Sequence, residues 1–227
     1  FRITGNGQYR QRSTDDLYVY QNYGFMTIEE LEAATYLARD SAIINYFPTN
    51  SVRLPVDTVN AVKNGVVPSY YAGRIEPYVD WQIKTNYLYR NDLMLLDFLA
   101  TNAWERPLYF ANPNSVDQVL DVDQYCHLEG FVYRFMPVKA ENYIRSLGGL
   151  DTRASYDILI NKCKWGNLND PQVTVDRESF RNTMIPKQNF MRLVQALMDE
   201  KKTDSAVRVT DLVVEIFPNE KFPFDLY

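Results

Sequence analysis

The sequence predicts an α/β fold, in which a small mixed or parallel sheet carries packed helices and is followed by a C-terminal helical hairpin. Two patterns predict it. Short alternating or β-branched segments recur up to Met136, whereas apolar residues at three- and four-residue spacing dominate after about residue 145. The 227 residues, 46% of them hydrophobic, are enough to bury a substantial core. We therefore expect an α/β domain over residues 1–145 and a helical C-terminal subdomain packed on it over residues 146–227.

The first third of the chain is expected to contain one helix and several short strands. Thr27 and Glu30 have the spacing of a capping box and predict a helix that ends near Asp40. Asn64-Gly65 marks a turn, and Pro68 is expected to keep the chain after it extended. β-Branched or alternating segments predict strands at residues 43–47, 51–57 and 78–83.

A long helix is predicted from a cap at Asn91 or Asp92 to about Ala103. It is apolar on nearly all sides, which is typical of a helix between layers. A short strand over residues 107–110 follows it. Together with the strand at 78–83, these elements suggest a right-handed strand–helix–strand crossover.

The second half begins with a short helix expected within residues 116–124 and a strand over 131–136. Helical spacing then predicts one helix over 155–163 and a hairpin of two more, with Pro186 breaking the segment before them. The hairpin helices contain residues 190–198 and 206–216, and they are joined by a turn that Thr203 or Asp204 is expected to end as a helix cap.

Composition excludes several classes of function. The net charge of −5 argues against a general nucleic-acid binder, which carries a basic stripe. His127 is the single histidine, and no Cys-x-x-Cys pair accompanies it, so we expect no metal site and no cofactor. Cys126 and Cys163 either form a disulfide or remain thiols, and buried thiols are favoured because unpaired cysteine commonly packs in cores. No serine-hydrolase elbow, Walker loop or zincin motif occurs, so no self-sufficient catalytic constellation is expected.

Candidate binding residues gather at the end of the predicted long helix. Asn102, Trp104 and Arg106 place an amide, an indole and a guanidinium just before a strand, where a cleft often forms. Trp104 suits stacking on a ring and Arg106 suits bidentate binding of a phosphate or carboxylate. The alternatives are a core role for Trp104 and a clamp on the preceding helix for Arg106. Asp97, the one charge in an apolar run, either belongs to a site, or faces a polar gap or pairs with Arg106.

Aromatic residues are unusually frequent at 14%, with 17 tyrosines among them. Amphipathic rings of this kind either fill half-buried core positions or form a surface that stacks on sugars or holds peptides. His127, beside Cys126, is not expected to be catalytic, because neighbours on a strand point to opposite faces.

Several stretches resemble one protein family when they are taken together and in order. They are Leu54-Pro55-Val56-Asp57 with Asn64-Gly65, Asn91-Asp92-Leu93-Met94-Leu95-Leu96-Asp97, Ala100-Thr101-Asn102-Ala103-Trp104-Glu105-Arg106-Pro107-Leu108-Tyr109-Phe110-Ala111, Glu129-Gly130-Phe131-Val132-Tyr133-Arg134 with Pro137-Val138, and Lys164-Trp165-Gly166-Asn167. Over roughly residues 17–217 the chain is similar to the C-terminal soluble region of a Bacteroides-type family of membrane proteins, which are protein O-mannosyltransferase-like glycosyltransferases of the GT-C architecture.

The resemblance implies an extracytoplasmic domain on the periplasmic side of the inner membrane. In that family a multi-helix membrane domain comes first and carries the catalytic acids, so the domain seen here is expected to be an accessory or acceptor-binding part and not catalytic by itself. Its expected partners are its own membrane domain and an acceptor protein or glycan. A chain that opens at Phe1 without Met is consistent with a fragment of such a protein.

Two other classes of function are weighed beside this one. A non-enzymatic envelope interaction domain would use the helical hairpin to bind a partner protein. A free-standing hydrolase would use Asp97 or Glu129 and would need a pair of carboxylates at glycosidase distances. An exposed cleft lined by Tyr or Trp would favour the acceptor-binding domain over both.

Overall fold

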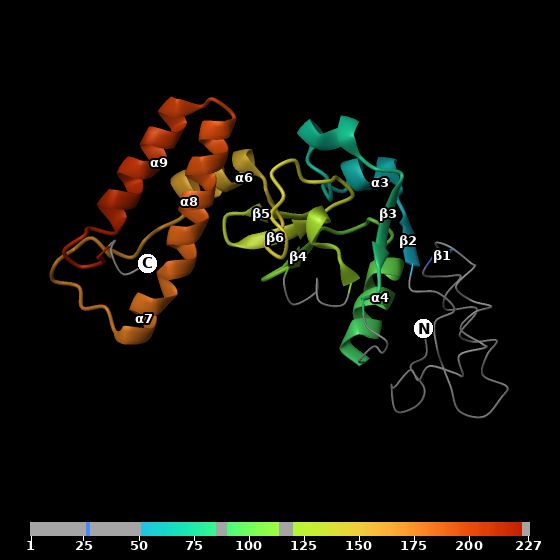
Figure 1. The fold of residues 1–227 in the computed structure, drawn as a ribbon, viewed down its shortest axis with the longest axis horizontal. Helices are drawn as coiled ribbons and strands as arrows, with labels where there is room; N and C mark the ends of the chain where they lie inside the picture. The colour runs from blue at the N-terminus through green and yellow to red at the C-terminus, as the bar shows by residue number, and fades with distance from the viewer. Residues whose placement is uncertain (1–25, 28–50, 85–89, 114–119, 224–227) are drawn as a thin grey trace.

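The computed structural model describes residues 26–27, 51–84, 90–113 and 120–223. It confirms the predicted class: two small sheets and several helices, with two long antiparallel helices at the C-terminal end. Figure 1 shows the described parts in a row, with the sheet of β1–β3 at one end, the second sheet in the middle and the helical hairpin at the other end. The predicted strand at 43–47 and nearly all of the helix predicted from Thr27 to Asp40 lie outside the described residues; Thr27 itself belongs to β1.

The first sheet has three strands in the order β1-β2-β3, with β1 parallel and β3 antiparallel to β2. Alternation in β2 and β3 buries one face, including Val52, Val79 and Trp81. Opposite them, Arg53 donates two hydrogen bonds to Asp80 across the strands, at 2.8 and 2.7 Å. The strands are β1 (Met26–Thr27), β2 (Ser51–Pro55) and β3 (Tyr78–Gln82).

Two helices separate β2 from β3. Asp57 caps α3 (Thr58–Lys63) by accepting a hydrogen bond from the Asn60 amide. The turn at Asn64-Gly65 forms as predicted, with Gly65 at φ +69°, where an L side chain would be strained. The chain after Pro68 then forms the 3₁₀ helix η2 (Ser69–Arg74) and not the extended segment that was predicted. Proline fixes φ of residue 68 at −57°, a value that also suits the start of a helical turn.

The long helix α4 (Arg90–Asn102) follows β3 as predicted. It is not buried on all sides, however, because Met94 and Phe98 are exposed while Leu96 and Leu99 face the core. The strand after it, β4 (Leu108–Phe110), belongs to the second sheet. The predicted crossover within one sheet is therefore wrong: β3 and β4 end up in different sheets, and α4 passes from one to the other.

The second sheet has the order β4-β6-β5-β7. Its neighbours are antiparallel except for β5 and β7, which run parallel. Every residue of β5 is buried, and β5 is one of the two inner strands of this sheet. Only β4 and β6 were expected here. Beside β4, the strands are β5 (Cys126–Glu129), which follows the short 3₁₀ helix η3 (Asp123–Tyr125), β6 (Val132–Phe135) and β7 (Gly149–Leu150).

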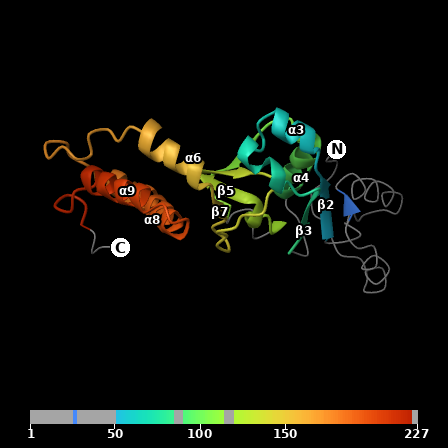
Figure 2. The same cartoon turned by 90° about the horizontal axis from the view of Figure 1, so that it is seen from above.

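Helices dominate after β7. Asp151 caps α6 (Thr152–Tyr156), which continues as the π-helical segment η4 (Asp157–Lys162), and Figure 2 shows α6 leading from the sheet toward the hairpin. After α7 (Arg177–Asn182), the hairpin consists of α8 (Met184–Asp199) and α9 (Thr203–Ile216). Pro186 does not break α8, because it lies in the first turn, where a backbone N–H has no helical partner to lose. The cap of α9 is Lys202, one residue before the predicted positions.

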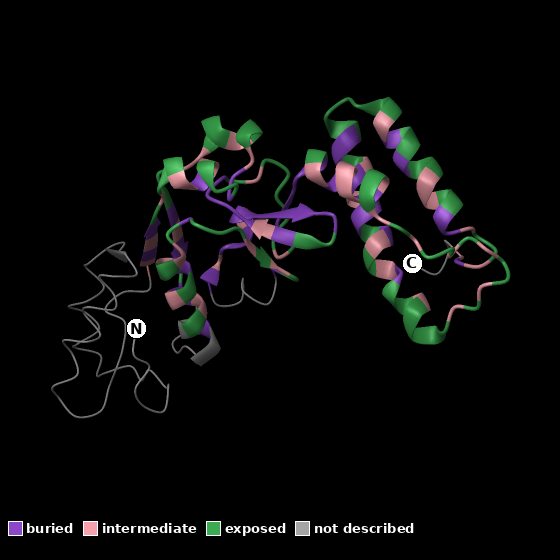
Figure 3. Cartoon of the chain, turned by 180° about the vertical axis from the view of Figure 1, so that it is seen from behind, coloured by how far each residue is buried: buried purple, intermediate pink, exposed green. Residues whose placement is uncertain are grey.

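Aromatic side chains fill the space between the hairpin and the segment before it. Trp165 packs against Phe190 and Phe217, with ring centroids 5.2 and 5.9 Å away. Asn189, buried on α8, donates a 2.7 Å hydrogen bond to the Gly130 carbonyl in the β5–β6 turn. The hairpin is thus attached to the sheet through a polar contact as well as apolar ones, and Figure 3 shows the buried faces on the central strands and on the inner sides of α8 and α9.

Two further features bear on the expectations. Cys126 is buried and Cys163 is partly exposed, and no disulfide joins them. Within the described ranges, every helix is too short or too polar to traverse a lipid bilayer.

Candidate functional site

Trp104 lies at the end of α4, as expected, but its indole is buried. Only 4% of the residue is exposed, and its Nε1–H donates a 2.7 Å hydrogen bond to the Pro55 carbonyl at the end of β2. The ring stacks on Phe135 of β6, with centroids 5.9 Å apart and planes 15° from parallel. Trp104 therefore packs between the two sheets, and the geometry favours its core alternative over stacking on a ligand.

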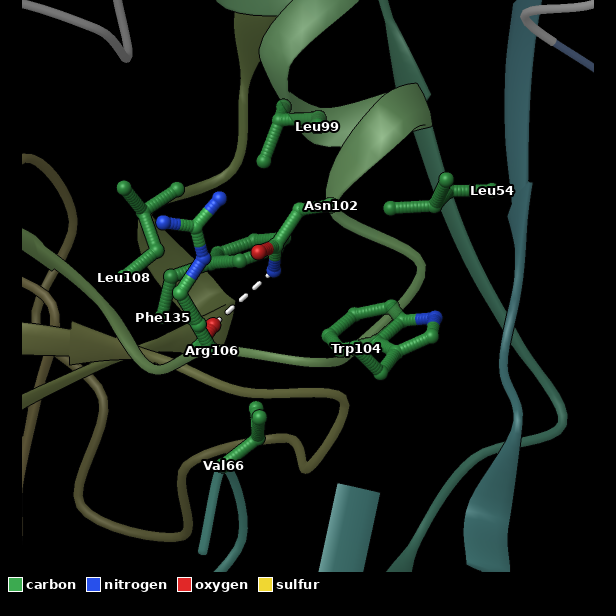
Figure 4. Close-up of a pocket in the computed structure, with 8 residues that line it drawn as sticks. All are labelled: Leu54, Val66, Leu99, Asn102, Trp104, Arg106, Leu108 and Phe135. Carbon is green, nitrogen blue, oxygen red and sulfur yellow. Dashed lines mark hydrogen bonds between the residues drawn. The ribbon is translucent and has the colours of Figure 1, made fainter. Parts of the chain in front are cut away.

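Asn102 and Arg106 bracket the turn that follows α4 and contains Trp104. The Asn102 side chain donates a 2.9 Å hydrogen bond to the Arg106 carbonyl, which closes the end of the helix (Figure 4). Both residues line a pocket with Trp104 and apolar neighbours, but the cavity has a volume of about 10 Å³, enough for one water molecule. The Arg106 residue is exposed. This geometry favours a helix ending over a binding cleft, and the ligand-binding role of these residues stays a prediction.

Asp97 is separate from this group. It is half-buried on α4, and it does not line the pocket around Trp104. No ion pair joins it to Arg106, although the structure describes both residues. Its carbonyl accepts a 2.8 Å hydrogen bond from the Thr101 hydroxyl, a bond within the helix.

A much larger cleft lies elsewhere, where η2, β5, β7, α6 and the α8–α9 turn meet. Its volume is about 210 Å³, and its lining includes Tyr70, Tyr71, His127, Asp151, Arg153 and Glu200. We refer to it as the tyrosine cleft. Sequence reasoning did not assign it, because its walls come from segments more than a hundred residues apart. The one signal in the sequence was the excess of tyrosine.

The two tyrosines are consecutive in η2 and lie beside each other, with ring centroids 4.8 Å apart. Tyr70 is 42% exposed, and its hydroxyl donates a 2.7 Å hydrogen bond to Asp151. Burial, together with the Asp151 carboxylate, raises the pKa of the Tyr70 hydroxyl above its ordinary value, and burial does the same for Tyr71. Both therefore remain neutral phenols, which present an apolar ring face beside a hydroxyl.

The acids of the cleft already have partners. Asp151 is fully buried, and besides the Tyr70 hydroxyl it accepts a hydrogen bond from the Ala154 amide, which makes it the cap of α6. Glu200 receives a 2.6 Å hydrogen bond from the Thr152 hydroxyl and a 2.6 Å ion pair from Lys202. Burial works to raise the Glu200 pKa, but these two partners outweigh it and lower the pKa. Its bond to Thr152 fixes the hairpin turn against α6.

His127 forms part of the cleft's inner wall and is 1% exposed. One ring nitrogen, Nε2, lies 2.7 Å from the Val138 carbonyl. A carbonyl only accepts, so Nε2 carries the proton and Nδ1 is the unprotonated nitrogen. Burial lowers the pKa of the imidazole. The ring is therefore neutral near pH 7, and it packs 5.7 Å from Tyr71.

Because His127 is the only histidine, its effect on stability can be isolated by substitution. Its pKa is lower in the folded state than its ordinary 6.5, so the unfolded chain binds more protons below that pH. The free energy of unfolding should therefore decrease as the pH falls below 6.5, by up to about 1.4 kcal/mol per unit.

The measurement is urea unfolding of the wild type and a His127→Gln variant at several pH values. The difference between the two curves should shrink as the pH falls, because only the wild type loses the histidine contribution. A difference that does not change between neutral and mildly acidic pH would contradict a buried, neutral His127.

The described residues contain no group of three or more His, Cys, Asp or Glu side chains placed to hold a metal ion. Glu129, one of the acids named for a hydrolase, is held by Arg134 in β6, with Nε 2.7 Å from one carboxylate oxygen. A second guanidinium nitrogen donates to the other oxygen at 3.1 Å. The tyrosine cleft itself presents aromatic rings, hydrogen-bonding groups and charged side chains to a ligand.

Comparison with known proteins identifies one family. A family model described as TMEM260-associated domain 2 matches residues 4–154, which is more than half of the chain. The matched range includes the two tyrosines, His127 and the start of α6, whereas the hairpin turn lies beyond it. No curated protein and no solved structure matches the chain. The chain belongs to the TMEM260-associated domain 2 family.

Proposed function

We propose that this chain is the accessory, acceptor-binding domain of a multi-spanning membrane glycosyltransferase of the protein O-mannosyltransferase-like type. In this proposal it lies on the periplasmic side of the inner membrane, is not catalytic alone and works beside its own membrane domain. Family membership supports the proposal, because the family's description associates the domain with TMEM260. The ordered motifs from Leu54 to Asn167 support it as well.

The observation that carries the proposal is the tyrosine cleft. A sugar or a hydroxyl-bearing peptide presents apolar patches next to hydroxyls, and half-exposed tyrosines beside charged groups match both. Tyr70 is held in place by its hydrogen bond to the fully buried Asp151, so the ring does not have to be ordered when a ligand arrives. The cleft therefore provides a preformed surface of the kind that the proposed role requires.

Replacing Tyr70 by alanine is expected to weaken ligand binding about fivefold or more, because it removes an aromatic face worth roughly a kcal/mol. The measurement is a titration of the whole chain with mannosides and with serine- and threonine-containing peptides, followed by NMR. Tryptophan fluorescence would not report on this cleft, because none of the tryptophans lines it.

The matched control is Tyr78→Ala on β3, since Tyr78 is 45% exposed and lies outside the cleft. This control should bind as the wild type does, and Tyr70→Phe, which keeps the ring, should bind nearly as well. If the wild type shows no saturable shifts at millimolar ligand, or if both alanine variants behave alike, the acceptor-binding role is wrong.

A second candidate function uses the hairpin. Met191 on α8 is 71% exposed, and Met198, seven residues later, lies exposed on the same face; Val207 and Val214 repeat this spacing on α9. Exposed methionines adapt to varied partners, so this face favours a non-enzymatic interaction domain. Met191→Lys should abolish capture of an envelope partner protein in a pull-down if that role holds, and Tyr70→Ala should not.

A further inference from the structure

The charges of the tyrosine cleft do not all cancel locally. Its three acids are paired: Asp151 with Tyr70 and the α6 backbone, Glu200 with Lys202, and Glu141 with Arg74, whose nitrogen lies 3.2 Å from the carboxylate. Two of the three cations that line the cleft, Arg74 and Lys202, form ion pairs with these acids. The cleft as a whole is neutral, but Asp151 is held by two neutral donors, and the third cation forms no ion pair with a described carboxylate.

That cation is Arg153, in the first turn of α6. Its guanidinium lies over the Tyr70 ring, 4.9 Å from the centroid. Within the described part of the chain it makes no ion pair or hydrogen bond through its side chain. Arg153 is exposed, so the N–H groups of its guanidinium are open to a ligand, and they form a planar fork that matches a carboxylate.

The tyrosine ring under this guanidinium is itself held in place. Asp151, fully buried, holds the Tyr70 hydroxyl, and the Tyr70 ring in turn supports Arg153. We propose that the tyrosine cleft recognises a carboxylate on its ligand, which Arg153 binds through two N–H groups while the body of the ligand packs on the tyrosines. This deepens the proposed function and rests on it, because it names the ligand chemistry of the same cleft.

A singly charged ligand group fits better than a doubly charged one. Two carboxylates, those of Asp151 and Glu200, line the same cleft as Arg153, so a phosphate dianion would meet more repulsion there than a monoanion would. A carboxylate matches the one unpaired cation. It has two sources with the same chemistry: an acidic side chain in a peptide, or a uronic acid sugar.

The test compares ligands that differ only in this charge, using the whole chain and NMR. One arm pairs glucuronate with methyl glucoside, and the other pairs an aspartate-containing peptide with its asparagine counterpart. If the carboxylate comes from a sugar, glucuronate should bind about tenfold more tightly than methyl glucoside; if it comes from a peptide, the aspartate peptide should bind about tenfold more tightly than its asparagine counterpart. Arg153→Gln should remove that preference, whereas Arg208→Gln, an exposed arginine on α9 outside the cleft, should keep it.

The outcomes separate the two proposals. If neutral ligands bind and the acidic ones bind no better, the carboxylate proposal is wrong and the acceptor-binding function stands. A preference that survives Arg153→Gln also overturns it, because another group must then hold the charge. Tighter binding of inorganic phosphate than of either acid would overturn the choice of carboxylate. Absence of binding in every arm rejects both proposals.

Discussion

Replacing Trp104 by alanine is expected to lower the free energy of unfolding by about 3–5 kcal/mol, the usual cost of removing a buried aromatic side chain. The ring contacts Phe135 of the second sheet, and its N–H reaches the Pro55 carbonyl of the first, so alanine leaves a cavity between the sheets and an unpaired carbonyl. Most domains are stable by only about 5–15 kcal/mol, so the midpoint of urea unfolding should move clearly.

Two control variants separate the contribution of the indole ring from that of its hydrogen bond and of its neighbours. Trp104→Phe keeps most of the ring and loses the hydrogen bond, so it should cost about 1 kcal/mol. Arg106→Ala, nearby but exposed, should change stability by no more than about 0.5 kcal/mol. If Trp104→Ala is as stable as the wild type, the indole is not the link between the sheets, and the ligand-stacking alternative for this residue regains weight.

The second large effect is expected from Arg134→Met, which should cost about 3–5 kcal/mol at neutral pH. Arg134 holds Glu129 through two guanidinium nitrogens, and Glu129 is 6% exposed on the inner strand β5. Burial raises the Glu129 pKa even with Arg134 present. Without Arg134, a carboxylate would remain in the sheet with little to offset its lost hydration.

The pH dependence identifies the cause. An acid with a raised folded-state pKa destabilises the protein above that pKa and not below its unfolded value, so the deficit of Arg134→Met should shrink as the pH falls toward about 4.5. The double variant Glu129→Gln/Arg134→Met lacks both charges of this buried pair and should recover part of the loss at about pH 7. A deficit that is constant with pH would show that Arg134 acts through packing alone.

Elements with a regular local pattern were predictable from the sequence. The helix α4 and the two hairpin helices follow from apolar spacing, and β2, β3 and β6 from alternation or β-branched content. β5 was missed because all four of its residues are buried, so its Cys-His-Leu-Glu sequence shows no alternation. The division into two sheets was missed as well, since it depends on which strands pair, and no local pattern encodes that.

The tyrosine cleft could not be located from the sequence, for a physical reason. Asn102, Trp104 and Arg106 stood out because they are close in sequence, and closeness in sequence at a helix end describes a turn as well as it describes a site. The tyrosine cleft brings Tyr70 to Asp151 and Thr152 to Glu200 across 81 and 48 positions. Nothing in the local sequence of Tyr70 indicates its partner, so the excess of tyrosine predicted a surface without locating it.

The Thr152–Glu200 hydrogen bond has a consequence for how the chain is divided in experiments. The predicted boundary after residue 145 passes through the tyrosine cleft, and the matched family region ends at residue 154, before the hairpin turn that supplies Glu200 and Lys202. A ligand that bridges these walls would stabilise sheet and hairpin together by mass action, because it binds only when both are folded. A fragment that stops at the family boundary would keep the tyrosines and Arg153 but lose the wall formed by Glu200 and Lys202. In such a fragment, ligand binding could no longer stabilise the position of the hairpin.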